Sequence, residues 1–134
     1  MENPNAGRIL VADDMRKWHY IATKNLEYWK FPKPLHAFSK KAAERIYHSE
    51  SPYLIITDIN FDPRYPGDPI NNKGNLDGLI LTRQIKKDDP SKIVIIMSSI
   101  EQGVKEIALE AGADYFIQKQ NFIKEFDTIV KQWK

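Results

Sequence analysis

The chain has 134 residues, which is the size of a single domain. Its formal net charge is only +2, and its 20 cationic residues are mixed among 18 acidic ones, so we expect no direct binding of nucleic acid. The absence of cysteine excludes disulfides, thiolate metal sites and cysteine nucleophiles. No apolar run approaches membrane-spanning length, and we therefore expect a cytoplasmic protein with no membrane partner.

The first part of the chain is expected to hold two strands, each followed by a helix. Residues 8–12 form a short apolar run, and apolar residues over 15–29 then recur at helical spacing. Two prolines follow this helix and cannot continue it. A short strand is expected over 35–38, and Ser39 stands at the N-cap position of the next helix.

The rest of the chain repeats the same alternation three times. Residues 53–57 and 93–97 are continuously apolar, as expected for strands buried on both faces. A fifth strand is expected over 115–117. Residues 60–76 are rich in proline and glycine and indicate a long loop. Helical spacing returns after each of these strands, over residues 77–87, 104–111 and 122–133.

This alternation predicts the fold class. Five strand–helix units with two-faced apolar strands require a parallel sheet covered by helices on both sides. We expect a flavodoxin-like (βα)5 sandwich whose five parallel strands have the order 2-1-3-4-5. One domain is expected to span residues 1–134, with the long loop at about 60–76 as an insertion and no second domain.

Polar residues follow four of the predicted strands at the point where each strand ends. Asp13 and Asp14 follow the first strand, Asp58 the third, Ser98 the fourth, and Lys119 the fifth. In an open parallel sheet, sites form beyond the carboxyl ends of the strands, near the point where strand order reverses. We therefore expect three carboxylates, a hydroxyl and an ammonium group to meet at one edge of the sheet.

This set of groups is suited to phosphoryl transfer. Three neighbouring carboxylates repel one another, and a hard divalent cation such as Mg²⁺ relieves that repulsion. A carboxylate that attacks a phosphoryl group forms an acyl phosphate. The cation, Lys119 and the Ser98 hydroxyl could then each stabilise one phosphoryl oxygen.

Each residue also has a simpler interpretation when it is taken alone. The Asp13–Asp14 pair could cap a helix, a role that could coexist with metal ligation at Asp14. Asp58 could be a loop carboxylate, Ser98 a turn residue and Lys119 a surface charge. Unrelated polar residues rarely gather at one edge of a sheet by chance. A shared phosphoryl-transfer site is therefore favoured over the separate roles.

With these residues in place, the sequence resembles the receiver domain of two-component response regulators. Residues 8–14 look like the opening strand and acidic pair of that family, and residues 54–58 resemble its phosphoacceptor strand. The pair Asp77-Gly78 looks like the start of its third helix. Residues 95–99 resemble its fourth strand with the switch hydroxyl, and residues 111–119 closely match the run into its lysine.

The resemblance implies specific roles for residues of this chain. Asp58 would receive a phosphoryl group from a sensor histidine kinase, a phosphotransfer protein or a small phosphodonor. Asp14 would bind Mg²⁺ (or Mn²⁺) directly, Asp13 largely through water, and Asn60 through its backbone carbonyl. Ser98 and Phe116 would form the switch pair, in which the hydroxyl moves toward the phosphate and the ring turns inward.

The output that the resemblance implies is a change of protein surface. The phosphorylated chain would present a different face to an unknown downstream protein, as a monomer or as a phosphorylation-dependent dimer. The chain would thus be a signalling switch that catalyses only its own phosphorylation and dephosphorylation.

Three features depart from the family pattern. The loop at 60–76 is about a dozen residues longer than usual, Gln120 replaces a usual proline, and Ser99 replaces a smaller residue. We expect a trans Lys119–Gln120 peptide bond or a rearranged lysine loop, because a cis bond without proline costs about 3 kcal/mol. These departures motivate the alternative of a phosphorylation-independent, receiver-like adaptor.

The sequence gives little support to other chemistry. An aspartyl phosphatase commonly carries a second aspartate two residues after its nucleophile, and Asn60 occupies that position here. Trp18 is expected to pack in the core. The histidines, His19, His36 and His48, are expected to lie away from the acidic edge.

Overall fold

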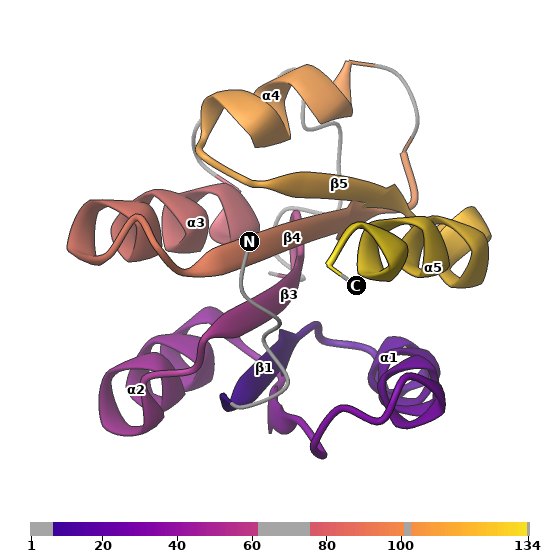
Figure 1. Ribbon diagram of the computed structural model, residues 1–134. Helices are drawn as coiled ribbons and strands as arrows, with labels where there is room; N and C mark the ends of the chain where they lie inside the picture. Colours follow the sequence, from indigo (N-terminus) through magenta and orange to yellow (C-terminus); the bar gives the residue numbers. More distant parts are fainter. Residues whose placement is uncertain (1–6, 62–75, 101–102, 134) are drawn as a thin grey trace.

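The apolar runs of the sequence form one five-stranded sheet in the computed structural model, which describes residues 7–61, 76–100 and 103–133. The strands are parallel and have the order β2-β1-β3-β4-β5, as predicted. Figure 1 shows β1, β3, β4 and β5 in this order. Their bounds are β1 Ile9–Ala12, β2 Leu35–Ala37, β3 Leu54–Asp58, β4 Ile93–Ser98 and β5 Tyr115–Gln118.

Helices cover both faces of this sheet. One face packs against α1 and α5, and the other packs against α2, α3 and α4 (Figure 1). The helices are α1 Arg16–Tyr28, α2 Lys40–Glu50, α3 Asp77–Asp88, α4 Val104–Glu110 and α5 Phe122–Gln132, with a 3₁₀ turn, η2, over Lys119–Asn121. The flavodoxin-like architecture expected from the sequence is therefore confirmed.

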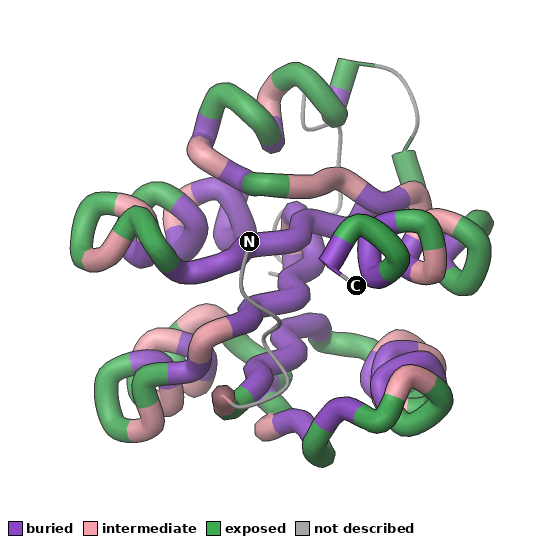
Figure 2. The backbone as a smooth tube through the Cα atoms, viewed as in Figure 1, coloured by how far each residue is buried: buried purple, intermediate pink, exposed green. Residues whose placement is uncertain are grey.

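Burial explains why the central strands read as continuous apolar runs. Every residue of β1, β3 and β4 is buried, because helices cover both faces of the sheet (Figure 2). Two apolar clusters result, one on each face of the sheet. The helices instead alternate buried and exposed positions, which is the pattern that made their spacing recognisable.

Local signals set one end of α2, as expected at Ser39, and one end of α4. The Ser39 hydroxyl accepts a hydrogen bond from the backbone N–H of Ala42 (3.2 Å) and caps α2. Gly112 follows α4 with φ of 108°, a conformation that favours glycine. Most of the predicted loop at 60–76, namely residues 62–75, lies outside the described residues.

Candidate phosphoryl-transfer site

Four strands deliver polar side chains to the carboxyl edge of the sheet. Asp13 and Asp14 follow β1, Asp58 is the last residue of β3, Ser98 is the last of β4, and Lys119 follows β5. Strands β1 and β3 are neighbours although β2 separates them in the chain, so chain order reverses here. The side chains that the sequence placed at this edge are thus delivered there by the fold.

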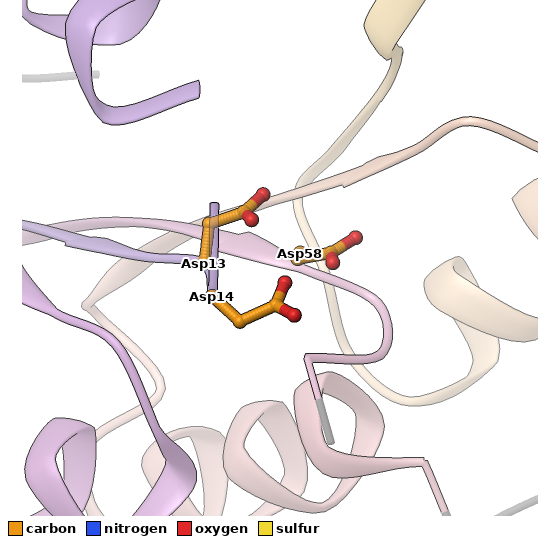
Figure 3. A group of neighbouring side chains, drawn as sticks. All are labelled: Asp13, Asp14 and Asp58. Atoms are coloured by element: carbon orange, nitrogen blue, oxygen red, sulfur yellow. The ribbon is translucent and has the colours of Figure 1, made fainter. Parts of the chain in front are cut away.

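The three carboxylates form a compact cluster. One oxygen from each of Asp13, Asp14 and Asp58 lies within 4.8 Å of the others. Figure 3 shows the three carboxylates extending to the same side of the backbone. Asp13 and Asp58 are buried, whereas Asp14 is exposed, so the cluster opens to solvent on the side of Asp14.

Lys119, the first residue of η2, provides a positive charge beside this cluster. Its Nζ lies 2.8 Å from Asp13 Oδ2 and 3.4 Å from Asp58 Oδ1. The lysine side chain is itself buried, so its contacts with both carboxylates are shielded from solvent. One ammonium group thus faces three carboxylates, and the cluster keeps an excess of negative charge.

The surroundings raise the pKa values of two of these carboxyl groups. Burial raises the pKa of Asp58 to about 7; the nearby Lys119 opposes this shift, while Asp13 and Asp14 add to it. Burial also raises the pKa of Asp14, and repulsion from Asp13 acts in the same direction. Both groups would therefore ionise more readily beside an added cation.

The donor set fits a hard divalent cation. Asp13 Oδ2 is buried and accepts no hydrogen bond within the described part of the chain, although it faces Lys119 Nζ. Asp13 Oδ1 accepts a hydrogen bond from the backbone N–H of Met15 (2.9 Å), which holds the carboxylate in place. Carboxylate oxygens are the protein ligands that Mg²⁺ prefers.

Neither aspartate of the acidic pair caps α1. The N-cap position of this helix belongs to Met15, which makes no side-chain capping hydrogen bond. The Asp13 carboxylate therefore binds Met15 within the loop, and Asp14 is left exposed. The geometry favours the metal interpretation over the capping one.

The loops after β4 and β5 are joined by a hydrogen bond that the sequence did not predict. Ser98 is buried, and its Oγ accepts a hydrogen bond from the backbone N–H of Ile100 (3.0 Å). Gln120 Nε2 donates to the backbone carbonyl of the exposed Ser99 (2.8 Å). No cis peptide bond occurs among the described residues, in agreement with the expected trans Lys119–Gln120 bond.

The two other candidate residues, Phe116 and Asn60, lie in β5 and just beyond β3. Phe116 lies in β5 opposite Ile96, is partly buried, and packs against the cluster on the α2, α3 and α4 face. Asn60 lies two residues beyond β3 and is also partly buried. Both positions are compatible with the roles that the resemblance implied, and those roles remain predictions.

Two side chains that were expected to lie elsewhere, Trp18 and His19, contact this site. The Trp18 ring packs partly on the core as expected, but its centroid also lies 5.0 Å from Lys119 Nζ. His19 Nε2 lies 2.7 Å from the backbone carbonyl of Asp13, so the expectation that this histidine lies away from the acidic edge was wrong. The turn between β1 and α1 brings both residues back to the edge, and helical spacing alone does not reveal this.

Gly78, near the start of α3, lies against the backbone at the end of β3. Its backbone N–H donates to the carbonyl of Ile59 (2.9 Å), and a Cβ at this position would lie 2.0 Å from the Asp58 carbonyl oxygen. Only glycine therefore allows α3 to approach the end of β3 this closely. This contact gives a physical reason for the Asp-Gly pair in the sequence.

Gly78→Ala is expected to destabilise the protein, because backbone atoms of Asp58 and Ile59 would have to move. We expect the free energy of unfolding to fall by about 3 kcal/mol, measured by urea denaturation. Ser49→Ala, on α2 away from this contact, should change it by less than about 0.5 kcal/mol. Equal stability of the two variants would show that α3 does not need the close approach.

Comparison with known proteins agrees with the fold. The sequence matches the family model of the response regulator receiver domain over residues 9–131. The chain therefore belongs to this family, whose members are signalling switches of two-component systems rather than classical enzymes. A search of curated proteins found no match. None of the described helices is long and apolar enough to cross a lipid bilayer.

Several solved structures have the same fold. The receiver domain of NtrX from Brucella abortus is 25% identical, with a TM-score of 0.72 over 93% of this chain and 96% of that one. A response regulator from Burkholderia pseudomallei with a phosphorylated aspartic acid and a calcium ion is 18% identical (TM-score 0.71; 92% and 65% covered). The BeF3-activated DrrB receiver domain is 17% identical (TM-score 0.72; 95% and 96% covered).

Proposed function

We propose that this chain accepts a phosphoryl group on Asp58 in the presence of Mg²⁺ (or Mn²⁺) and signals through a change of surface. The observation that carries the proposal is the convergence of three carboxylates and Lys119 at one edge of the sheet. Two structures with the same fold support it, one with a phosphorylated aspartic acid and one activated by BeF3.

The proposed chemistry assigns a task to each group. An oxygen of Asp58 forms a bond to phosphorus while the bond to the donor breaks, and the leaving group keeps the electron pair. Asp13, Asp14 and Asp58, with the Asn60 backbone carbonyl, would hold the cation, which supplies charge neutralisation at a phosphoryl oxygen. Lys119 would stabilise a second oxygen, and it lies close enough to Asp58 to do so.

Ser98 and Phe116 are the proposed switch pair. The Ser98 hydroxyl would leave its contact with the Ile100 N–H and donate to the third phosphoryl oxygen. Phe116, which is only partly buried, would then turn inward, and the altered face would bind a downstream protein. The donor would be a sensor histidine kinase, a phosphotransfer protein or a small phosphodonor.

We further propose that the chain acts as one receiver domain over residues 1–134, with an insertion at about 60–76. It would work in the cytoplasm without binding membranes or nucleic acid directly, as a monomer or a phosphorylation-dependent dimer. The scattered charge of the sequence supports the absence of a nucleic-acid role.

Incubation with Mg²⁺ and acetyl phosphate tests the proposal directly. We expect intact-protein mass spectrometry to show the addition of one phosphoryl group, which hydroxylamine then removes because it is an acyl phosphate. Chelation of the metal should prevent the addition. Absence of any mass gain over a range of metal and donor concentrations would contradict the proposal.

One observation favours the adaptor alternative. The Gln120–Ser99 hydrogen bond ties together the two loops that a phosphorylation switch would need to move. An adaptor would bind its partner equally well with and without beryllofluoride, which mimics the phosphoryl group. A receiver switch would show a difference between the two conditions.

Trp18 should report the state of the site. The Nζ atoms of Lys17 and Lys119 lie 5.2 Å and 5.0 Å from the centroid of its ring, so a shift of Lys119 changes the electric field at the indole. We expect Mg²⁺ with beryllofluoride to change tryptophan fluorescence in the wild-type protein. Trp18→Phe should remove most of this change, whereas Trp29→Phe, at the far end of α1, should keep it. If Trp18→Phe kept the fluorescence change and Trp29→Phe lost it, Lys119 would not be the charge that moves.

A further inference from the structure

A pair of histidines outside the acidic cluster faces each other across α1 and β2. His19 lies in α1 and is buried, whereas His36 lies in β2 and is exposed. The two Nδ1 atoms are 2.7 Å apart. His36 pairs with Val11 of β1, whose side chain belongs to the cluster on the α1 face, so both histidines lie on this side of the sheet.

The hydrogen bond of His19 to the backbone fixes which ring nitrogen carries the hydrogen. His19 Nε2 lies 2.7 Å from the carbonyl oxygen of Asp13, and a carbonyl can only accept. Nε2 is therefore protonated, and in neutral His19 the Nδ1 lone pair points at His36. Metal-binding histidines characteristically donate their second nitrogen to a backbone carbonyl or a carboxylate in this way.

We propose that His19 and His36 bind a transition-metal dication of the Zn²⁺ class through their Nδ1 atoms. Imidazole nitrogens favour Zn²⁺, Ni²⁺ and Cu²⁺ over Mg²⁺, so the pair differs in its choice of metal from the acidic cluster. The site does not depend on phosphorylation of Asp58. The two sites meet where His19 Nε2 contacts the backbone carbonyl of Asp13.

Without metal, one hydrogen bond joins His19 Nδ1 and His36 Nδ1. Because His19 Nδ1 accepts, His36 Nδ1 must donate. Metal binding moves that hydrogen to His36 Nε2, so both Nδ1 lone pairs become available with no net loss of a proton. Two tetrahedral Zn–N bonds of about 2.0–2.1 Å separate their nitrogens by about 3.3 Å. The pair must therefore open by about half an ångström, and His36 can move because it is exposed.

The surroundings leave room for water to complete the coordination shell. An open cavity of about 360 Å³ adjoins the pair and is lined by Arg16, His19, Tyr20, Thr23, His36 and Phe38. The Phe38 ring stacks on His19 with centroids 4.1 Å apart, which restrains the buried imidazole. With two protein ligands, waters would fill the remaining positions, and we expect a dissociation constant on the order of micromolar.

Zinc titration tests the proposal. The protein carries Asp58→Asn and excess Mg²⁺, so that zinc binding at the acidic cluster is suppressed, and ZnCl₂ is added in a calorimeter. We expect one equivalent to bind, with the ¹⁵N resonances of the Nδ1 atoms of His19 and His36 shifting together. His36→Ala should weaken binding about tenfold or more, comparable to the loss of a metal-site contact. This exposed position should tolerate the change without loss of the fold.

Two further variants separate this site from general zinc binding. His48→Ala removes a histidine of α2 that packs on Tyr47, and it should leave the affinity unchanged. Arg16→Ala removes a cation that lines the cavity, and it should tighten binding several-fold because like charges repel. Equal zinc affinity of the Asp58→Asn protein with and without His36→Ala, or unshifted His19 and His36 resonances, would overturn the proposal.

Discussion

Replacing Asp58 by asparagine is expected to abolish phosphoryl incorporation from acetyl phosphate in the presence of Mg²⁺. The amide has almost the same shape as the carboxylate, but it carries no negative charge and is a poor nucleophile. It also removes one of the three carboxylates that would hold the cation. Intact-protein mass spectrometry at matched times should show a phosphoryl adduct for the wild-type chain and none for Asp58→Asn.

The control is an aspartate away from the acidic edge. Asp89 lies just after α3, where its Oδ1 accepts hydrogen bonds from Ser91. The amide oxygen of asparagine can largely replace this acceptor. Asp89→Asn should keep wild-type phosphorylation. Asp14→Asn should retain the nucleophile but require more Mg²⁺, since it removes the exposed ligand. Phosphorylation of Asp58→Asn at the wild-type rate would place the acceptor on another residue.

The fold could be predicted from the sequence because the central strands are buried on both faces. Burial on both faces favours apolar residues without alternation, as at residues 54–56 and 93–97, and this pattern is visible in a single sequence. Once the strands are parallel, their carboxyl ends share one edge. Asp13, Asp58 and Lys119 could then be brought together by chain order alone.

The contacts around the acidic cluster could not be predicted in the same way. The contact of Lys119 with Asp13 as well as Asp58 depends on how the loop after β5 is oriented. The contact of His19 with Asp13 depends on the rotation of α1 against the sheet, and that of Gln120 with Ser99 on the conformations of two loops. Helical spacing identifies the face of a helix that packs on the sheet. It does not show which side chain at the border of that face contacts a backbone carbonyl.

The raised pKa of Asp58 was likewise not predictable, and it leads to a stability prediction. The sequence suggested repulsion among carboxylates, whereas burial is the largest cause of the shift in the structure. How deeply a residue at the end of a strand is buried depends on the packing of α3 and of the Lys119 loop around it. Gly78, which lets α3 approach the Asp58 backbone, is part of that packing.

We expect the free energy of unfolding of the metal-free protein to fall as the pH rises from about 4 to about 7. The pKa of Asp58 is about 7 in the folded protein, against an ordinary value of 3.8 that applies to the unfolded chain. Between these values the folded state holds a proton that the unfolded state has lost, so raising the pH favours unfolding. The shift of about three units corresponds to a loss on the order of 4 kcal/mol, complete above the folded pKa.

Urea denaturation of the wild-type protein and Asp58→Asn across this window, with and without Mg²⁺, measures the effect. Other groups titrate there as well, including His36, whose pKa burial lowers, so the difference between the two proteins isolates Asp58. Asp58→Asn should lack the part of the decrease in unfolding free energy that Asp58 causes. Without metal at neutral pH, it should be more stable than the wild-type protein. Saturating Mg²⁺ should remove most of the fall from the wild-type protein, because the cation binds the ionised cluster and offsets its repulsion. Parallel curves for the two metal-free proteins would show that Asp58 ionises in the folded chain as easily as in the unfolded one.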